Sequence, residues 1–255
     1  PLVRRAMKRD GQIVPVDSEH SAIAQCLASG VHERGLTAQR VTGKSELAQL
    51  VLTASGGPFR GKKRADLAEV TPQQALAHPT WNMGPVVTIN SSTLVNKGLE
   101  LIEAHLLFDV PASDIVPVVH PQSIVHSMVT WKDGATIAQA SPPDMKLPIA
   151  LGLTWPKRLP DIEKPVDFLQ RQEWTFEPVD SQTFPAINLA RAAVTESPTH
   201  PAVYNAANEV FVDAFLRGQL AYLSIVDLLE EVLAEHQGID EPTLDDILGA
   251  QEWAK

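Results

Sequence analysis

The sequence contains one cysteine and no long apolar segment. Because Cys26 stands alone among 255 residues, a disulfide framework is excluded, and a reducing compartment fits. No uninterrupted apolar run approaches the roughly 20 residues of a membrane-spanning helix, and no secretory leader is visible. We therefore expect a cytoplasmic protein without a membrane partner, most simply in a bacterial cytosol, with a plastid left open.

Positive charge is also scarce. The 21 Lys and Arg residues are outnumbered by 31 Asp and Glu residues, which gives a formal net charge of −10. This excess argues against nucleic acid as the main partner. There is no internal repeat and no low-complexity tract. The first residue is Pro1, so we expect a fragment or a processed product of a longer chain.

Strands alternate with helices through the first 155 residues, which favours a mixed α/β domain over 1–155. Residues 31–46 are polar and lack periodicity, so we predict a surface insertion there. A hairpin is indicated by the Lys-Asp-Gly sequence at 132–134. The expected strands lie at 13–16, 47–54, 85–90 and 114–120 and on both sides of this hairpin, and the expected helices at 18–30, 71–78 and 92–108.

The pattern changes after Trp155. Residues 156–182 are rich in proline and charge, so we predict a linker that crosses the surface. The remainder, 183–255, is helical throughout and predicts an all-α C-terminal domain with four helices. The fold class is therefore α+β, a mixed α/β domain with a β-sheet followed by a helical domain. The four expected helices are 185–195, 202–217, 223–236 and 242–254.

The first candidate site is "VDSEH", in which Asp17 and Glu19 are two residues apart. In an extended backbone both carboxylates point the same way. Two converging carboxylates repel unless they flank a lysine, water or a metal ion. Taken alone, this pair is more simply interpreted as two exposed carboxylates without a functional role.

The second candidate is "NSSTLVNKGLE", residues 90–100. Ser91, Asn96 and Lys97 offer donors near a helix start, where unpaired N–H groups favour phosphate. Glu100 falls on the same helix face as Asn96 and Lys97. The alternative is an exposed ion pair. Gly98 is costly inside a helix, which indicates that something comes close to the backbone there.

Two loops could also line a ligand site. "TASGGPFRG" ends a strand in a glycine turn that lets backbone N–H groups approach a ligand, although a plain tight turn is favoured. "HPTWNMG", residues 78–84, has the composition of a loop that closes over a substrate, although packing on the core is the better interpretation for a lone tryptophan. His120 and His126 lack zinc spacing, so we interpret them as structural. The remaining cation ligands are oxygens, which favours Mg²⁺ or Mn²⁺.

Seven stretches in this order resemble the 1-deoxy-D-xylulose 5-phosphate reductoisomerase family. The similarity covers the chain apart from 31–46 and the linker, and several of the motifs are long and specific. Asn82 stands where a serine is common in this family. The motifs are PVDSEH, LTASGGPF, HPTWNMG, SSTLVNKGLELIEAHLLF, HPQSIVHSMV, SPPDMKLPI and YNAANEVFVDAFL.

The resemblance implies a set of site residues. It makes Asp17, Glu19 and Glu100 the ligands of a divalent metal, with Glu19, Glu100 and His78 as the catalytic group. Residues 78–84 become a flexible flap, in which Met83 and Gly84 meet the nicotinamide. His126, Pro143 and Met145 fall on further walls of the pocket. The implied substrate-binding residues are Ser18, Ser55, His78, Trp81, Ser91, Asn96, Lys97 and Ser123, of which Ser55, Ser91, Asn96 and Lys97 hold phosphate.

The resemblance also implies a reaction. A metal-assisted rearrangement of 1-deoxy-D-xylulose 5-phosphate would precede reduction by NADPH to 2-C-methyl-D-erythritol 4-phosphate, a step of non-mevalonate isoprenoid biosynthesis, in a homodimer. The sequence has no G-x-G-x-x-G fingerprint, so we expect that this chain lacks the family's NADPH domain and is inactive alone. Two alternatives stay open: a self-contained metal-dependent phosphosugar isomerase or lyase, and a non-catalytic dimerisation fragment.

Overall fold

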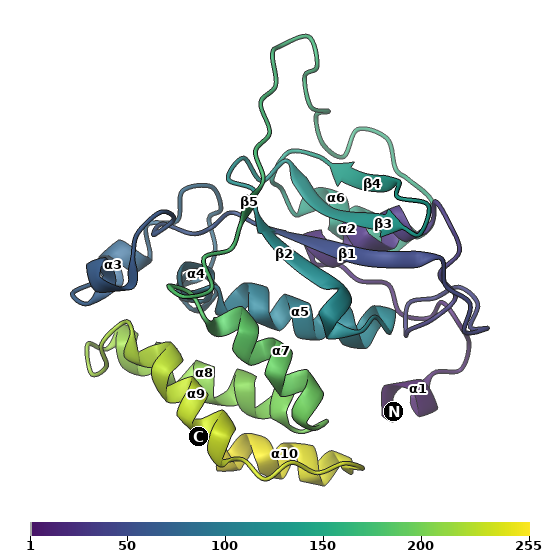
Figure 1. Ribbon diagram of the computed structural model, residues 1–255. Coiled ribbons are helices and arrows are strands. Elements are labelled where there is room, and N and C mark those ends of the chain that lie inside the picture. Colours follow the sequence, from purple (N-terminus) through teal and green to yellow (C-terminus); the bar gives the residue numbers. More distant parts are fainter. Residues whose placement is uncertain (1) are drawn as a thin grey trace. The chain divides into compact units, whose positions relative to one another are not determined.

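The computed structural model describes residues 2–255 of the chain (Figure 1). The chain forms two compact units. The sheet unit comprises the residues up to Ser55 together with Glu103–Pro178, and the helical unit comprises Gly56–Ile102 together with Val179–Lys255. Helix α5 (Val95–Phe108) contains residues of both units.

The sheet unit is built on five strands. Their order is β4-β3-β1-β2-β5, and β1 pairs with β2 in parallel. The other neighbours are antiparallel. The sheet is therefore mixed. Its strands are β1 (Leu47–Ala54), β2 (Ile115–Val119), β3 (Val125–Trp131), β4 (Thr136–Ala140) and β5 (Glu177–Pro178).

Helix α2 (Ser18–Leu27) packs against β3 and β4 of this unit. Ala22 and Ile23 on this helix are fully buried. Between α6 (Lys146–Thr154) and β5, the chain forms a long loop that projects away from the sheet (Figure 1). The remaining helical elements of the unit are α1 (Leu2–Ala6) and the 3₁₀ helix η2 (Ala112–Asp114).

The helical unit has its core around α8 (His200–Leu216). Tyr204 and Asn208 of this helix are fully buried, and Asn208 Nδ2 donates to Asn90 Oδ1 of α4 over 2.9 Å. Helix α8 also packs against α7, α9 and α10. The other helical elements are η1 (Arg64–Leu67), α3 (Pro72–Ala75), α4 (Pro85–Thr93), α7 (Ala186–Glu196), α9 (Ser224–Glu235) and α10 (Leu244–Trp253).

The structure confirms the α+β class, the hairpin, the buried strand at 47–54 and all four C-terminal helices. The predicted strand at 85–90 is wrong, because these residues belong to helix α4. Gly84 caps this helix and Pro85 occupies its first turn, where the fixed φ of proline suits a helix start. The predicted strand at 13–16 is also wrong, since no strand forms there.

The predicted helix over 92–108 begins later, at Val95. Leu94 separates α4 from α5 with a left-handed φ of 60°. Its backbone N–H donates to the carbonyl oxygen of Ser91 over 3.3 Å, and its side chain is buried. Ser91 therefore lies at the end of α4, whereas Asn96 and Lys97 lie in the first turn of α5.

The two units divide the chain differently from the expected domains 1–155 and 183–255 with a linker at 156–182. Residues 56–102 pack with the C-terminal helices, and Tyr222 Oη donates to the carbonyl oxygen of Ser92 over 2.8 Å. The end of the expected linker forms β5, which pairs with β2. Across residues 2–255, no helix has the length and apolar character needed to span a bilayer.

Candidate metal and substrate site

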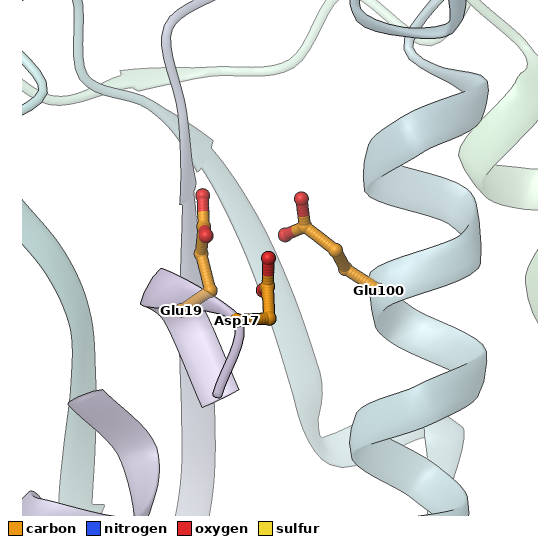
Figure 2. A group of neighbouring side chains, drawn as sticks. All are labelled: Asp17, Glu19 and Glu100. Carbon is orange, nitrogen blue, oxygen red and sulfur yellow. The ribbon is translucent and has the colours of Figure 1, made fainter. Parts of the chain in front are cut away.

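Three carboxylates lie close together in the structure. Asp17, Glu19 and Glu100 each offer one oxygen atom, and these three atoms all lie within 4.8 Å of one another. Figure 2 shows Asp17 and Glu19 at the start of α2 and Glu100 on α5. Carboxylate oxygens at this spacing repel one another and suit a hard divalent cation. The predicted grouping is thus present in the geometry.

Local sequence explains how the first two carboxylates are held. Asp17 is the N-cap residue of α2, but its side chain makes no capping bond and instead accepts from His20 Nδ1 at 2.9 Å. Ser18 Oγ donates to Glu19 Oε2 over 2.5 Å. Hydrogen bonds of this kind orient metal-binding carboxylates. Sequence reasoning overlooked His20, although its i, i+3 spacing from Asp17 was a usable signal.

Glu100 has two partners on its own helix. Asn96 Nδ2 donates to Glu100 Oε1 over 2.6 Å, and Lys97 Nζ forms an ion pair with Glu100 Oε2. Lys97 is 4% exposed and Glu100 is 5% exposed. The predicted shared face is therefore confirmed, while the alternative of an exposed ion pair is wrong. A buried pair of this kind offers little stability beyond its desolvation cost.

Gly98 has a packing explanation. A Cβ atom at this position would collide with Tyr204 Oη and lie 3.0 Å from the Cβ atom of Ala190. The group that comes close to the backbone is thus Tyr204 of α8, and this interpretation requires no ligand. Burial raises the pKa of Tyr204, whose hydroxyl donates to the carbonyl oxygen of Ala186.

The 78–84 loop is organised by its first residue. His78 Nδ1 accepts from the backbone N–H groups of Thr80 at 3.1 Å and Trp81 at 2.9 Å. Nε2 therefore carries the proton and donates to Ser91 Oγ over 3.1 Å. Burial lowers the pKa of His78. Two residues predicted at the substrate site, His78 and Ser91, are thus in direct contact.

The other residues of this loop are partly open to solvent. Trp81 and Met83 are half-buried, and Gly84 is exposed at the N-cap of α4. The loop therefore has an aromatic and a thioether side chain that are not committed to a core. This arrangement disfavours the simple core-packing alternative.

The glycine turn after β1 makes a close backbone approach. Gly56 and Gly57 both have positive φ values, 85° and 63°. A Cβ atom on Gly57 would lie 2.9 Å from the carbonyl oxygen of Ser91, so a side chain there would clash with α4. Ser55, which precedes the turn, is half-buried.

The remaining predicted residues lie around the turn between β2 and β3 and before α6. Ser123 is 7% exposed and has a φ of 52°, and His126 Nε2 lies 3.1 Å from the carbonyl oxygen of Ser141. Met145 caps α6, and both it and Pro143 are half-buried. His120 is fully buried with backbone partners at both ring nitrogens, which agrees with its structural interpretation.

Two family models match successive parts of the chain. The model described as the 1-deoxy-D-xylulose 5-phosphate reductoisomerase C-terminal domain matches residues 13–108. The model described as the DXP reductoisomerase C-terminal domain matches residues 140–255. The chain thus carries the C-terminal domains of a reductoisomerase. It belongs to the 1-deoxy-D-xylulose 5-phosphate reductoisomerase family.

Curated relatives agree with this assignment. The enzyme of this name from Beutenbergia cavernae is 60% identical over 100% of the chain, which covers 62% of that relative. The enzyme from Mycobacterium marinum is 57% identical over 100% of the chain and is covered to 61%. The chain therefore spans about three fifths of the length of these relatives.

Solved structures of the same family share the fold. The reductoisomerase of Zymomonas mobilis in complex with NADPH aligns with a TM-score of 0.82 at 39% identity, over 94% of this chain and 58% of that one. A DOX-P reductoisomerase in complex with NADPH, fosmidomycin and magnesium aligns with a TM-score of 0.82 at 35% identity, over 95% and 61% respectively.

Proposed function

We propose that the chain forms the metal- and substrate-binding part of an NADPH-dependent 1-deoxy-D-xylulose 5-phosphate reductoisomerase. The observation that carries this proposal is the meeting of Asp17, Glu19 and Glu100 within 4.8 Å. A conversion of 1-deoxy-D-xylulose 5-phosphate to 2-C-methyl-D-erythritol 4-phosphate belongs to non-mevalonate isoprenoid biosynthesis. Family membership and the magnesium in a solved relative support the choice of reaction and cation.

The metal ligands in this proposal are Asp17, Glu19 and Glu100. Three carboxylates without a soft ligand fit Mg²⁺ or Mn²⁺. A bound divalent cation would polarise the substrate carbonyl and stabilise negative charge during the rearrangement. His20 and Ser18 would keep the Asp17 and Glu19 carboxylates turned toward that cation, because each already bonds one of their oxygens.

The phosphate anchor consists of Asn96 and Lys97 with Ser91 and Ser55. Asn96 and Lys97 lie in the first turn of α5, where the positive end of the helix dipole favours an anion. Lys97 supplies a nearly fully buried positive charge. Binding energy from this distant phosphate can orient the reacting carbons.

The flap 78–84 covers the substrate in this proposal. His78 would keep the flap backbone in place through Thr80 and Trp81 while it donates to Ser91. Trp81 would exclude water, and Met83 with Gly84 would face the nicotinamide. Ser18 and Ser123 would contact the sugar backbone.

We further propose that the chain by itself does not turn over NADPH. The glycine turn that follows β1, at Gly56 and Gly57, packs against Ser91. No G-x-G-x-x-G sequence is present. The hydride donor would then require further sequence, consistent with the coverage of about three fifths of the relatives.

A homodimer completes the proposal. Strand β4 forms one edge of the sheet and is mostly exposed. In the projecting loop, Phe168 is 71% exposed and Leu169 is 95% exposed. An open strand edge and exposed apolar side chains are each features that suit a second copy of the chain. The paired change of Phe168 and Leu169 to serine should shift the mass measured by light scattering from dimer to monomer.

Titration calorimetry tests the metal site. We expect the chain to bind Mn²⁺, and fosmidomycin in its presence, and we expect Glu100→Gln to lose both. Glu231→Gln, an exposed change on α9, is the matched control and should bind as the unchanged chain does. Absence of Mn²⁺ binding at any accessible concentration would refute both this function and the self-contained isomerase or lyase.

A charge reversal separates a ligand site from a mere ion pair. Lys97→Glu combined with Glu100→Lys keeps a pair of opposite charges on the same helix face. Stability measured by urea denaturation should largely survive this exchange, whereas Mn²⁺ and fosmidomycin binding should disappear. Retained binding in the exchanged variant would contradict the separate roles of Lys97 and Glu100.

A further inference from the structure

His120 directly follows β2 and is fully buried. Its Nδ1 lies 2.9 Å from the carbonyl oxygen of Thr175. Its Nε2 accepts from the backbone N–H groups of Ile124 at 3.2 Å and Val125 at 3.1 Å. Because backbone N–H groups only donate, Nε2 carries no proton and Nδ1–H is the donor to Thr175. The ring is therefore neutral and fixed in one tautomer.

The same turn is tied a second time to the segment that leads into β5. Gln122 Nε2 donates to Thr175 Oγ1 over 3.0 Å, and the backbone N–H of Thr175 donates to Gln122 Oε1 over 3.3 Å. The His120 ring stacks on Phe176 with a centroid distance of 4.6 Å and an interplanar angle of 13°. Residues 120–125 are thus clamped to residues 175–176.

Ser123 sits inside this clamped turn in an uncommon conformation. Its φ is 52°, and its backbone N–H donates to the carbonyl oxygen of His120 over 3.1 Å. A left-handed conformation of a non-glycine residue persists where its surroundings determine it. The backbone N–H groups that donate to the His120 ring begin at Ile124, the residue that follows Ser123.

We propose that His120 is a positioning residue for the sugar-phosphate site, acting through Ser123. Nε2 holds the N–H groups of Ile124 and Val125 and thereby keeps Ser123 in the left-handed conformation that presents its hydroxyl. This inference rests on the proposed function, in which Ser123 contacts the substrate. His120 would contribute to substrate binding without contacting the ligand. The end of the segment 156–176 would contribute as well, because it holds His120 in place.

Two conservative variants of the whole chain test the hydrogen bonds of the two ring nitrogens one at a time. An asparagine amide reaches the place of Nδ1, so His120→Asn can keep the bond to Thr175 but leaves the N–H groups of Ile124 and Val125 without their acceptor. A glutamine amide reaches the place of Nε2, so His120→Gln can keep that acceptor and loses the Thr175 bond. The probe is fosmidomycin in saturating Mn²⁺, measured by calorimetry.

We expect His120→Asn to weaken fosmidomycin binding about tenfold or more, because two backbone N–H groups lose their acceptor. His120→Gln should stay within about threefold of the unchanged chain. The affinity for Mn²⁺ alone should be equal in all three proteins, which a general loss of structure would not allow. Gln122→Ala, which loosens the clamp without touching His120, provides a second variant should His120→Asn not fold. It should weaken fosmidomycin binding in the same direction.

A double-mutant cycle with Ser123→Ala completes the test. If His120 acts through Ser123, the effect of His120→Asn or Gln122→Ala should largely disappear in the Ser123→Ala background. An undiminished effect there overturns the inference, as do equal losses in His120→Asn and His120→Gln. An unchanged chain that binds Mn²⁺ but no fosmidomycin overturns the proposed substrate site itself, and the inference with it.

Discussion

At Gly98 of α5, a missing side chain lets the hydroxyl of Tyr204 approach the helix backbone. The sequence indicated that something lay close to this glycine, but its identity depended on α8, about one hundred residues away in the chain. Asp17, Glu19 and Glu100 were easier to assign, because each lies in a motif long enough to identify a family. His20 also lies in the motif PVDSEH, but its bond to Asp17 became evident only in the structure.

Gly98→Ala should destabilise the chain by about 1–3 kcal/mol, because an added methyl group overfills a buried contact. Urea denaturation measures the change in unfolding free energy. The same substitution in a Tyr204→Phe background should cost less, since the colliding hydroxyl is gone. Gly249→Ala on α10, where nothing lies within 4 Å, is the control and should stabilise by about 0.5–1 kcal/mol. A neutral Gly98→Ala would contradict the packing explanation.

His78 should make stability depend on pH. Burial lowers its pKa below the ordinary 6.5, so the unfolded chain binds a proton more readily than the folded one. Its contribution is therefore complete above about pH 6.5 and is lost as the pH falls below that value. Unfolding free energies at pH 7 and pH 5 should differ less in His78→Gln than in the unchanged chain. An equal difference in both proteins would show that His78 contributes nothing.

At the scale of elements, hydrophobic periodicity and the positions of glycine, proline and capping residues predicted most helices and strands. The exceptions were 13–16, where no strand forms, and 85–90, where the β-branched run favoured a strand. Gly84 and Pro85 already carried the signal of a helix start, but the packing of α4 against α8 decided the outcome. Likewise the break at Leu94 has no sequence signal, because leucine rarely adopts a positive φ.

At the junction between α4 and α5, we expect glycine to give a more stable chain than alanine, the reverse of the usual order in a helix. Leu94→Ala and Leu94→Gly both lose a buried side chain, but only glycine relieves the left-handed conformation. Leu94→Gly should therefore be more stable than Leu94→Ala by about 1 kcal/mol in urea denaturation. At Ala192, exposed on α7, alanine should instead be more stable than glycine. The same order at both positions would exclude a strained junction.

At the scale of the whole molecule, the chain does not form its compact units from successive stretches. The helical unit joins 56–102 to 179–255, through bonds such as Asn208 to Asn90 and Tyr222 to Ser92. The change in composition near residue 155 suggested a domain boundary there and a separate C-terminal helical domain. Composition does not reveal such a pairing, because the pairing depends on contacts between residues far apart in the chain.

The segment 183–255 produced alone should therefore lack a cooperative thermal transition. It would expose the faces of Tyr204 and Asn208 that 56–102 normally covers, together with polar groups deprived of their partners. Circular dichroism during heating measures the transition, and the complete chain serves as the reference. A sharp transition of the isolated segment would contradict this expectation and support the predicted division into successive domains.

The buried ion pair between Lys97 and Glu100 has a thermodynamic consequence. A cation that takes the Glu100 carboxylate leaves the Lys97 charge in need of an anion, and a phosphate that takes Lys97 frees the carboxylate. The two ligands should therefore bind with positive cooperativity, and each should raise the affinity of the other by the same factor. Calorimetry of Mn²⁺ with and without fosmidomycin, and the reverse, measures both factors. Because Lys97 and Glu100 lie within one turn of the same helix and exchange partners, the binding of metal and the binding of phosphate would be thermodynamically coupled.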